Sequence, residues 1–384
     1  MCRRLWVLVM LCALGAGPAA WGHPLETLQP GTWMEIPSST MQAVLYPYPP
    51  GVPHGSSFPI GAESGAAYDT TRDRLVVFGG GHADSADNAL YAFDLTTLHW
   101  SRLNDPALRT DPTDALQATG YYPDANGQPD LQQPRAGHSY NLLQYVPALD
   151  RVCTFGTAVL WHNGQRALME TLCFDQQTRL WERKAPPLTA RIGSWTALDL
   201  MTGHIWQHGT SVNYYLAEYD PVADTWTKRS GNYGRYEYYT TAAIDPIHRQ
   251  LVVVPGCRGS GMATCPSMPA GYTFALSQSG LLTPQSLSMV GAEAIATGVR
   301  NPGLDYDPGS GTIVAWNGGA DVYTLDMATR TWTRVPPAPG NTVVPTNPAA
   351  TGTYGRWRYS PRYNVFIVVN SVKQNVFAYR LRWQ

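Results

Sequence analysis

The chain has 384 residues and a formal net charge of −1, so no overall basic field favours a nucleic acid as its partner. Charged residues make up 14 % of the chain, well below the roughly one quarter that is usual for globular proteins. Glycine occurs 36 times and proline 31 times, which favours many short strands joined by tight turns. Because the net charge is close to zero, any charged ligand must be recognised by a local group of charged residues.

The N-terminus has the pattern of an export signal. Two arginines precede an apolar run from Leu5 to Leu14, and small residues follow up to Ala20. This run is shorter than the roughly 20 residues that span a bilayer, so a signal peptide is favoured over a membrane anchor. We expect residues 1–20 to be removed and residues 21–384 to be secreted or periplasmic, with no transmembrane segment after signal removal.

Four cysteines remain in the mature chain, an even number for an oxidising compartment. We expect two disulfides, Cys153 with Cys173 across neighbouring strands and Cys257 with Cys265 across a Gly-rich loop. A zinc site made from the same cysteines is the weaker alternative, because no Cys-x-x-Cys spacing is present. The sequence requires no cofactor and leaves the presence of a metal ion open.

A four-strand pattern repeats along the mature chain. The first copy predicts strands at Gly65–Tyr68, Leu75–Phe78, Leu90–Phe93 and Trp100–Leu103, with turn residues between them. The same order recurs in five further copies, whose second strands begin near Val152, Ile205, Leu251, Ile313 and Val365. The fourth copy lacks the Trp of the outer strand. From these repeats we predict an all-β fold, a single β-propeller of about six four-stranded blades, with seven blades as the alternative.

The last copy has only three strands and ends after Val376–Tyr379. Near the mature N-terminus, Thr32–Ile36 reads as a strand without a copy of its own, and Trp33 occupies the place of the outer-strand Trp. We expect this strand to complete the last blade. Closing the ring in this way removes the exposed sheet edges that favour aggregation.

The segment Leu75-Val-Val-Phe-Gly-Gly-Gly-His82, followed by Asn88 to Asp94 and Trp100, resembles the kelch repeat of galactose-oxidase-like propellers of the secreted bacterial type. The resemblance extends over nearly the whole mature chain, although only the first copy is a close match. It implies architecture rather than chemistry. The copper-radical oxidation of galactose oxidase needs a Tyr linked to a Cys, and no cysteine is obviously free for that link.

Candidate site residues gather on one face of the predicted disk. Because strands alternate in direction, the start of each inner strand and the loop between the second and third strands lie on the same face, and polar residues that converge there indicate a ligand site. The catalytic candidates are His138, Tyr239 and His82. The substrate-binding candidates are Arg235, Arg300, Arg356, Arg258, His162, His208 and Asn317.

The arginines suggest the class of ligand. Guanidinium groups near one axis repel one another, so either buried carboxylates neutralise them or the face binds an anion. Arg and aromatic rings suit an acidic polysaccharide, with Arg neutralising a uronate while His or Tyr moves protons in a β-elimination. The group His138, Tyr239 and Arg235 is similar in residue type to the set used by some secreted propeller polysaccharide lyases.

We therefore expect a secreted propeller that acts on an acidic polysaccharide or another anionic glycan, as a uronate-eliminating lyase. The alternative is a non-catalytic propeller that binds a glycan or a protein through the same residues. A structural surface protein is the third interpretation, but it does not explain why His residues gather on one face. Glycoside hydrolysis needs two carboxylates across the sugar, and the predicted face has few.

Overall fold

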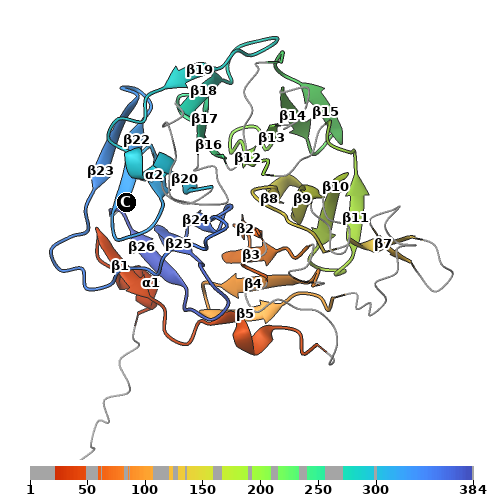
Figure 1. Ribbon diagram of the computed structural model, residues 1–384, viewed down its shortest axis with the longest axis horizontal. Helices are drawn as coiled ribbons and strands as arrows, with labels where there is room; N and C mark the ends of the chain where they lie inside the picture. Colours follow the sequence, from red (N-terminus) through yellow and green to blue (C-terminus); the bar gives the residue numbers. More distant parts are fainter. Residues whose placement is uncertain are drawn as a thin grey trace, which may run out of the picture.

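Six four-stranded antiparallel sheets form a closed ring in the computed structural model, viewed along its axis in Figure 1. The fold is thus a six-bladed β-propeller, as the repeats predict. The structure describes residues 22–48, 59–61, 63–81, 85, 87–106, 121–123, 129–134, 136–158, 167–188, 193–208, 215–232, 240–255, 271–297 and 301–382.

Each blade runs from an inner strand at the axis to an outer strand at the rim. In that order the strands are β2 (Gly65–Asp69), β3 (Arg74–Phe78), β4 (Leu90–Asp94) and β5 (His99–Arg102) in the first blade; β8 (Leu143–Val146), β9 (Arg151–Ala158), β10 (Ala167–Asp175) and β11 (Trp181–Lys184) in the second; β12 (Thr196–Leu198), β13 (Ile205–His208), β14 (Leu216–Asp220) and β15 (Thr225–Lys228) in the third; β16 (Thr241–Asp245), β17 (Gln250–Val254), β18 (Gly271–Ala275) and β19 (Gln285–Leu287) in the fourth; β20 (Gly303–Asp307), β21 (Thr312–Trp316), β22 (Val322–Asp326) and β23 (Thr331–Val335) in the fifth; and β24 (Trp357–Ser360), β25 (Val365–Val368), β26 (Phe377–Arg380) and β1 (Thr32–Glu35) in the sixth.

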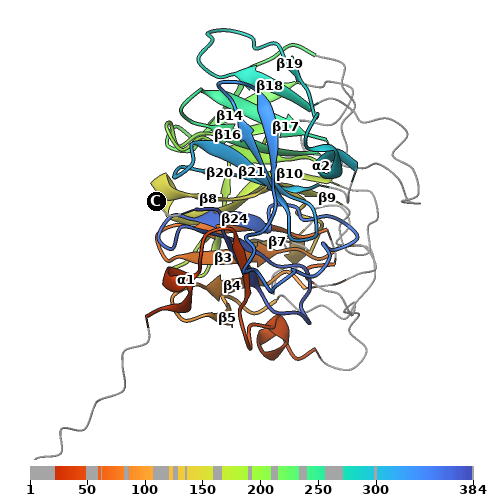
Figure 2. The same cartoon turned by 90° about the vertical axis from the view of Figure 1, so that its left-hand side faces the viewer.

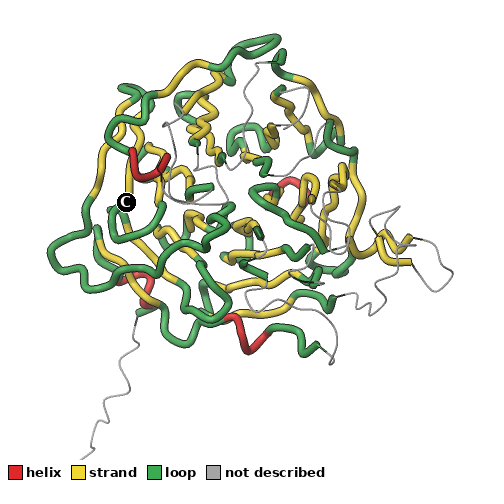
Figure 3. The backbone as a smooth tube through the Cα atoms, viewed as in Figure 1, coloured by secondary structure: helices red, strands yellow, loops and turns green. Residues whose placement is uncertain are grey.

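Other elements of the described chain are short (Figure 3). They are the hairpin of β6 (Tyr121–Pro123) and β7 (Pro129–Pro134), the helices α1 (Pro24–Thr27) and α2 (Glu293–Thr297), and the 3-10 turns η1 (Met41–Val44) and η3 (Pro147–Leu149). No helix among the described residues is long and apolar enough to cross a membrane.

The N-terminal strand closes the ring as predicted. β1 pairs antiparallel with β26, in a register that sets Thr32 opposite Arg380 and Glu35 opposite Phe377. The Trp33 side chain is 3 % exposed, and its Nε1 donates a hydrogen bond of 2.9 Å to the Ala320 carbonyl of the fifth blade. The sixth blade therefore joins the two ends of the described chain.

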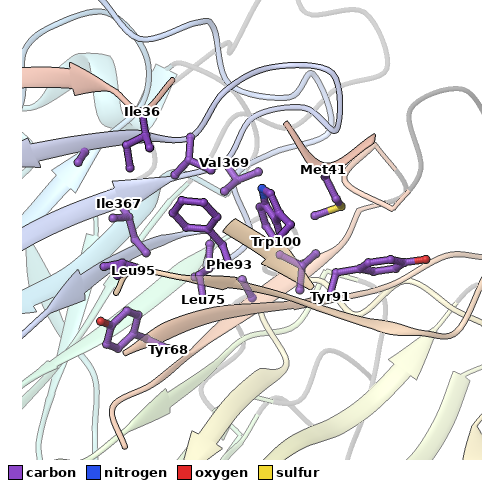
Figure 4. Packing of buried hydrophobic residues seen from close by; sticks show 14 of the residues in the cluster. Ile36, Met41, Tyr68, Leu75, Tyr91, Phe93, Leu95, Trp100, Ile367 and Val369 are labelled. Atoms are coloured by element: carbon purple, nitrogen blue, oxygen red, sulfur yellow. The ribbon is translucent and has the colours of Figure 1, made fainter. Parts of the chain in front are cut away.

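Apolar side chains fill the spaces between neighbouring blades. Figure 4 shows one such core, where Leu75, Phe93 and Trp100 of the first blade meet Ile367 and Val369 from the sixth. All of these side chains are buried. Strands buried on both faces explain why the second strand of four copies, β3, β17, β21 and β25, is mainly a run of apolar residues rather than an alternating pattern.

The two faces of the disk differ in what they carry. We call the face at which the inner strands begin the start face, and the opposite face, where a turn joins each inner strand to the second, the hairpin face. Figure 2 shows the ring from the side, with α2 on the start face at the right. On the hairpin face, both guanidinium nitrogens of Arg249 bond the buried Asp199 at 2.7 Å and thereby clamp the fourth blade to the third.

Cys153 and Cys173 form the predicted disulfide between β9 and β10, where the two residues are direct partners in the strand register. This bond agrees with the oxidising compartment expected from the export signal. Cys257 and Cys265 lie outside the described residues, as do residues 1–20. Their assignments stay predictions.

One expected boundary differs from the structure. The candidate His138 fits the sequence pattern of a residue that begins the second inner strand, whereas β8 begins only at Leu143. Between them, Leu142 donates its N–H to the Ser139 carbonyl at 2.9 Å, and Tyr140 adopts a left-handed backbone with φ of 45°. A tight turn therefore precedes the strand and carries the polar residues of the candidate site.

Candidate functional site

Left-handed backbone recurs where the inner strands begin. Glu63, Tyr140, Asn301 and Tyr354 have φ values of 48°, 45°, 46° and 49°, each two or three residues before its strand. Side chains other than glycine rarely adopt this conformation, and for bulky residues it is a genuine outlier. Such strain costs about 1–3 kcal/mol per residue. The same conformation also occurs in turns of the hairpin face, but among the described residues no turn there joins a His, a Glu and a Tyr side chain, as Glu63, His138 and Tyr140 are joined on the start face.

Three of the residues near these turns form a chain of polar contacts, made of one ion-pair contact and one hydrogen bond. The Nε2 atom of His138 lies 3.3 Å from Oε2 of Glu63, and its Nδ1 atom lies 3.1 Å from the Tyr140 hydroxyl. A neutral imidazole donates through one nitrogen and accepts through the other. Since a carboxylate faces Nε2, we assign the proton to Nε2, so that Nδ1 accepts from the Tyr140 O–H.

Close backbone contacts between the first and second blades fix this chain. The Tyr140 N–H donates to the Glu63 carbonyl at 2.8 Å, and the Gly65 N–H donates to Oγ of Ser139 at 2.8 Å. A Cβ atom on Gly65 would lie 2.1 Å from the Tyr140 carbonyl oxygen, so only glycine fits at this point. The Glu63–His138–Tyr140 chain is thus built across a blade interface and held by the main chain on both sides.

The sixth blade contributes Tyr354 and Arg356 to the same region. The rings of Tyr140 and Tyr354 meet at 5.6 Å with an angle of 64° between their planes. Arg356 is fully buried, and its guanidinium donates to the carbonyls of Val369 at 2.9 Å, Gly352 at 2.5 Å and Ser64. Its cationic head therefore ties the first blade to the sixth.

Burial lowers the pKa of the Arg356 guanidinium to about 10, and the nearby Tyr354 and Glu63 oppose this shift. In the same blade, burial also lowers the pKa of Arg358, and the carboxylate of Asp305 opposes this shift. Arg356 and Arg358 therefore each lie near an acidic residue, although their guanidinium groups donate hydrogen bonds to main-chain carbonyls.

The other described candidates lie apart from the Glu63–His138–Tyr140 chain. His208 is buried in the third blade against Trp195, with ring centroids 5.8 Å apart, and burial lowers its pKa to about 3, so it is neutral. Asn317 donates to the carbonyl of Ile295 in α2 at 3.1 Å. Six candidates fall outside the described residues and stay predictions: His82, Tyr239, Arg235, Arg300, Arg258 and His162.

Sequence reasoning found His138 but not its partners Glu63 and Tyr140. A usable signal existed, because both residues occupy equivalent places ahead of the inner strands of consecutive blades.

As regards metals, the described part of the chain contains no group of three or more His, Cys, Asp or Glu side chains that could hold an ion.

Comparisons with known proteins concern the fold only. No family model matches the chain, and no curated protein matches it. Similar solved structures include a gluconolactonase from Xanthomonas campestris, at 11 % identity and a TM-score of 0.48 over 85 % of this chain and 86 % of that chain. A fungal alcohol oxidase of the AA5 family, in complex with copper, is similar at 13 % identity and a TM-score of 0.44 over 84 % of this chain and 74 % of that chain. Similarity at these levels carries no information about activity.

Proposed function

We propose that this propeller is a secreted polysaccharide lyase that cleaves an acidic polysaccharide by β-elimination at a uronic acid. The observation that carries the proposal is the Glu63–His138–Tyr140 chain, in which a carboxylate lies beside one imidazole nitrogen and a phenol hydroxyl is hydrogen-bonded to the other. A nucleophile or base oriented through a second and third group is the recurrent arrangement of activated catalytic residues.

The roles follow from the positions of the protons. Tyr140 transfers its hydroxyl proton to Nδ1 of His138, and the Glu63 carboxylate stabilises the resulting imidazolium. The phenolate then removes the proton next to the uronate carboxyl group, the neighbouring C–O bond breaks as a C=C bond forms, and a proton is returned to the leaving oxygen. His82 and Tyr239 remain the predicted donors of that last proton.

Support for an anionic substrate comes from the sequence. Arg235, Arg258 and Arg300 are predicted on the start face, and a guanidinium recognises a carboxylate with paired hydrogen bonds. Neutralising the uronate carboxylate lowers the barrier to removal of the adjacent proton. We assign substrate recognition to these arginines rather than to Arg356, because the Arg356 guanidinium is already bonded to three carbonyls.

A non-catalytic glycan-binding or protein-binding propeller is the second candidate. One observation favours it: His138 and Tyr140 are each only 2 % exposed, although a base must touch its substrate. In that case the Glu63–His138–Tyr140 chain holds the first and second blades together, and ligands bind to the rim of the start face.

The test is the ultraviolet absorbance of unsaturated uronates during incubation of the mature protein with alginate, pectate, glucuronan, ulvan and glycosaminoglycans. Tyr140→Phe removes only one hydroxyl and keeps the ring against Tyr354. We expect it to reduce kcat by about 100-fold or more. The matched control is Tyr219→Phe, which removes a buried hydroxyl bonded to Asp224 at 2.7 Å in the third blade and should leave turnover unchanged.

A flat absorbance trace on every polysaccharide rejects the lyase function for those substrates. Calorimetric titration with the same panel then separates the two candidates. A binding propeller shows affinity for a glycan without turnover, and that affinity is unchanged by Tyr140→Phe.

A further inference from the structure

A cavity of about 110 Å³ lies on the axis of the ring. Every inner strand contributes to its wall, which includes Tyr68, Gln144, Ala197, Ala243, Asp305 and Arg358. The lining continues to residues that directly follow inner strands, among them Thr70, Pro308 and Pro361. The cavity therefore opens on the hairpin face.

Asn141 lies ahead of the second inner strand, on the start-face side of the ring. Its Nδ2 atom donates to Oγ1 of Thr241 at 3.0 Å, which joins the second blade to the fourth across the axis. A Cβ atom on Gly355 would lie 2.6 Å from Oδ1 of Asn141 and 2.9 Å from Nη2 of Arg358, so the chains are in close contact here. The lining of the cavity includes none of Glu63, His138 and Tyr140, so the cavity is distinct from the candidate site on the start face.

Arg358 and Asp305, two residues of opposite charge, line the cavity. Among the contacts of the described residues, the two side chains form no ion pair within 4.0 Å. Arg358 is 8 % exposed, its Nη2 donates to the Ala66 carbonyl at 3.2 Å, and its Nε has no hydrogen-bond partner among the described residues. Asp305 accepts the N–H groups of Tyr306 and Tyr359, each at 2.9 Å. Burial raises the pKa of Asp305 and lowers that of Arg358, and each group opposes the shift of the other, so the two are near but not paired.

Buried charges that are separated from each other are costly unless a third group neutralises them. A guanidinium favours a carboxylate, and a carboxylate favours an O–H or N–H donor. The remaining wall includes apolar side chains such as Ala242 and Ile244, which strengthen such contacts by lowering the local dielectric constant.

We propose that this axial cavity binds a small organic acid bearing a donor group next to its carboxylate, an α-hydroxy or α-amino acid. The ligand carboxylate bonds Arg358 and its hydroxyl or ammonium group bonds Asp305. A cavity of about 150 Å³ accommodates benzene, so this one suits a ligand of about six non-hydrogen atoms or fewer. The site is independent of the start face and of the proposed lyase activity.

Isothermal titration of the mature protein with glycolate, L-lactate, glycine and acetate tests the proposal, supported by the ligand-induced rise in Tm. We expect saturable binding of glycolate, L-lactate or glycine at concentrations of about 10 mM or below. Acetate, which lacks the donor, should bind at least about tenfold more weakly. Comparing glycolate with glycine distinguishes the hydroxy acid from the amino acid.

Arg358→Gln should weaken binding by about tenfold or more, because it removes a charge-assisted hydrogen bond. The matched control is Arg362→Gln, at an exposed arginine of the same blade that bonds Asp73 at 3.0 Å, and it should bind as the wild type does. If Arg358→Gln fails to fold, Asp305→Asn replaces it and should reduce the preference for glycolate over acetate. The proposal is overturned if none of the acids binds, if acetate binds as tightly as glycolate, or if the variants at the two cavity charges bind like the control.

Discussion

The closure of the ring gives the sharpest test of the fold. Trp33 in β1 packs against Trp316, Trp357 and Tyr379 with centroid distances of 5.9, 5.7 and 4.9 Å, and its Nε1 bonds the Ala320 carbonyl. Removing a buried Trp side chain costs about 3–5 kcal/mol. Because this side chain is 3 % exposed and loses a hydrogen bond as well, we expect Trp33→Ala to lower the free energy of unfolding by about 4 kcal/mol.

Trp226 supplies the matched control, since it occupies the same place in the outer strand of the third blade. It packs against Phe155 and Tyr219 and donates its Nε1 to the Ala185 carbonyl at 3.0 Å, but it is only half-buried. We expect Trp226→Ala to cost about 2 kcal/mol. Urea unfolding of the mature protein, followed by far-ultraviolet circular dichroism, measures both values.

Hydrogen exchange distinguishes closure from packing alone. β1 pairs with the rest of its blade only through β26, so Trp33→Ala should release the amides of Thr32–Glu35 to faster exchange, whereas Trp226→Ala should leave them protected. Equal costs for the two substitutions, together with unchanged exchange in β1, would refute the view that the N-terminal strand secures the ring.

Two further predictions concern buried charges. Arg249→Gln leaves the buried Asp199 carboxylate without its bidentate partner and should cost about 3 kcal/mol in urea unfolding. Arg362→Gln, whose side chain is 56 % exposed, should leave the urea midpoint unchanged. Burial raises the pKa of Asp87 to about 6, above the roughly 3.9 of an unfolded chain. The folded state then binds more protons, so the free energy of unfolding should fall as the pH rises from about 4 to about 6, and Asp87→Asn should abolish this part of the pH dependence.

The architecture was predictable because its signals are local. Turn residues and apolar runs mark each strand, and the unmatched strand at Thr32–Glu35 combined with the incomplete last copy indicates how the ring closes. Even the outer strand of the fourth blade, β19, forms without the Trp of the other copies. Ladder hydrogen bonds to β18 suffice there, because strand pairing depends on the backbone and not on one side chain.

The site was predictable only in part. The repeat pattern shows on which face of the disk a residue lies, but not whether its side chain is exposed or buried. Arg356 was expected on the surface of the start face, and it does lie at that end of its blade, yet its guanidinium is buried among carbonyls. The pairing of Glu63 with His138 depends on how two blades meet, and neither residue's own neighbours in the sequence encode that contact. Asp305 and Arg358 likewise face one cavity from adjacent blades.

Left-handed backbone occurs on both faces of the disk, but in different settings. On the hairpin face it ends tight turns, both at short polar residues such as Asp73 and Asp150, which bond locally, and at large half-buried ones such as Arg330. On the start face the same conformation is imposed on Tyr140 and Tyr354, which are large and buried. A turn alone does not require tyrosine there, and glycine would relieve the strain at little cost. The tyrosines are therefore best explained by what their side chains do, and the hydrogen bond from Tyr140 to His138 is the contact that supplies a reason.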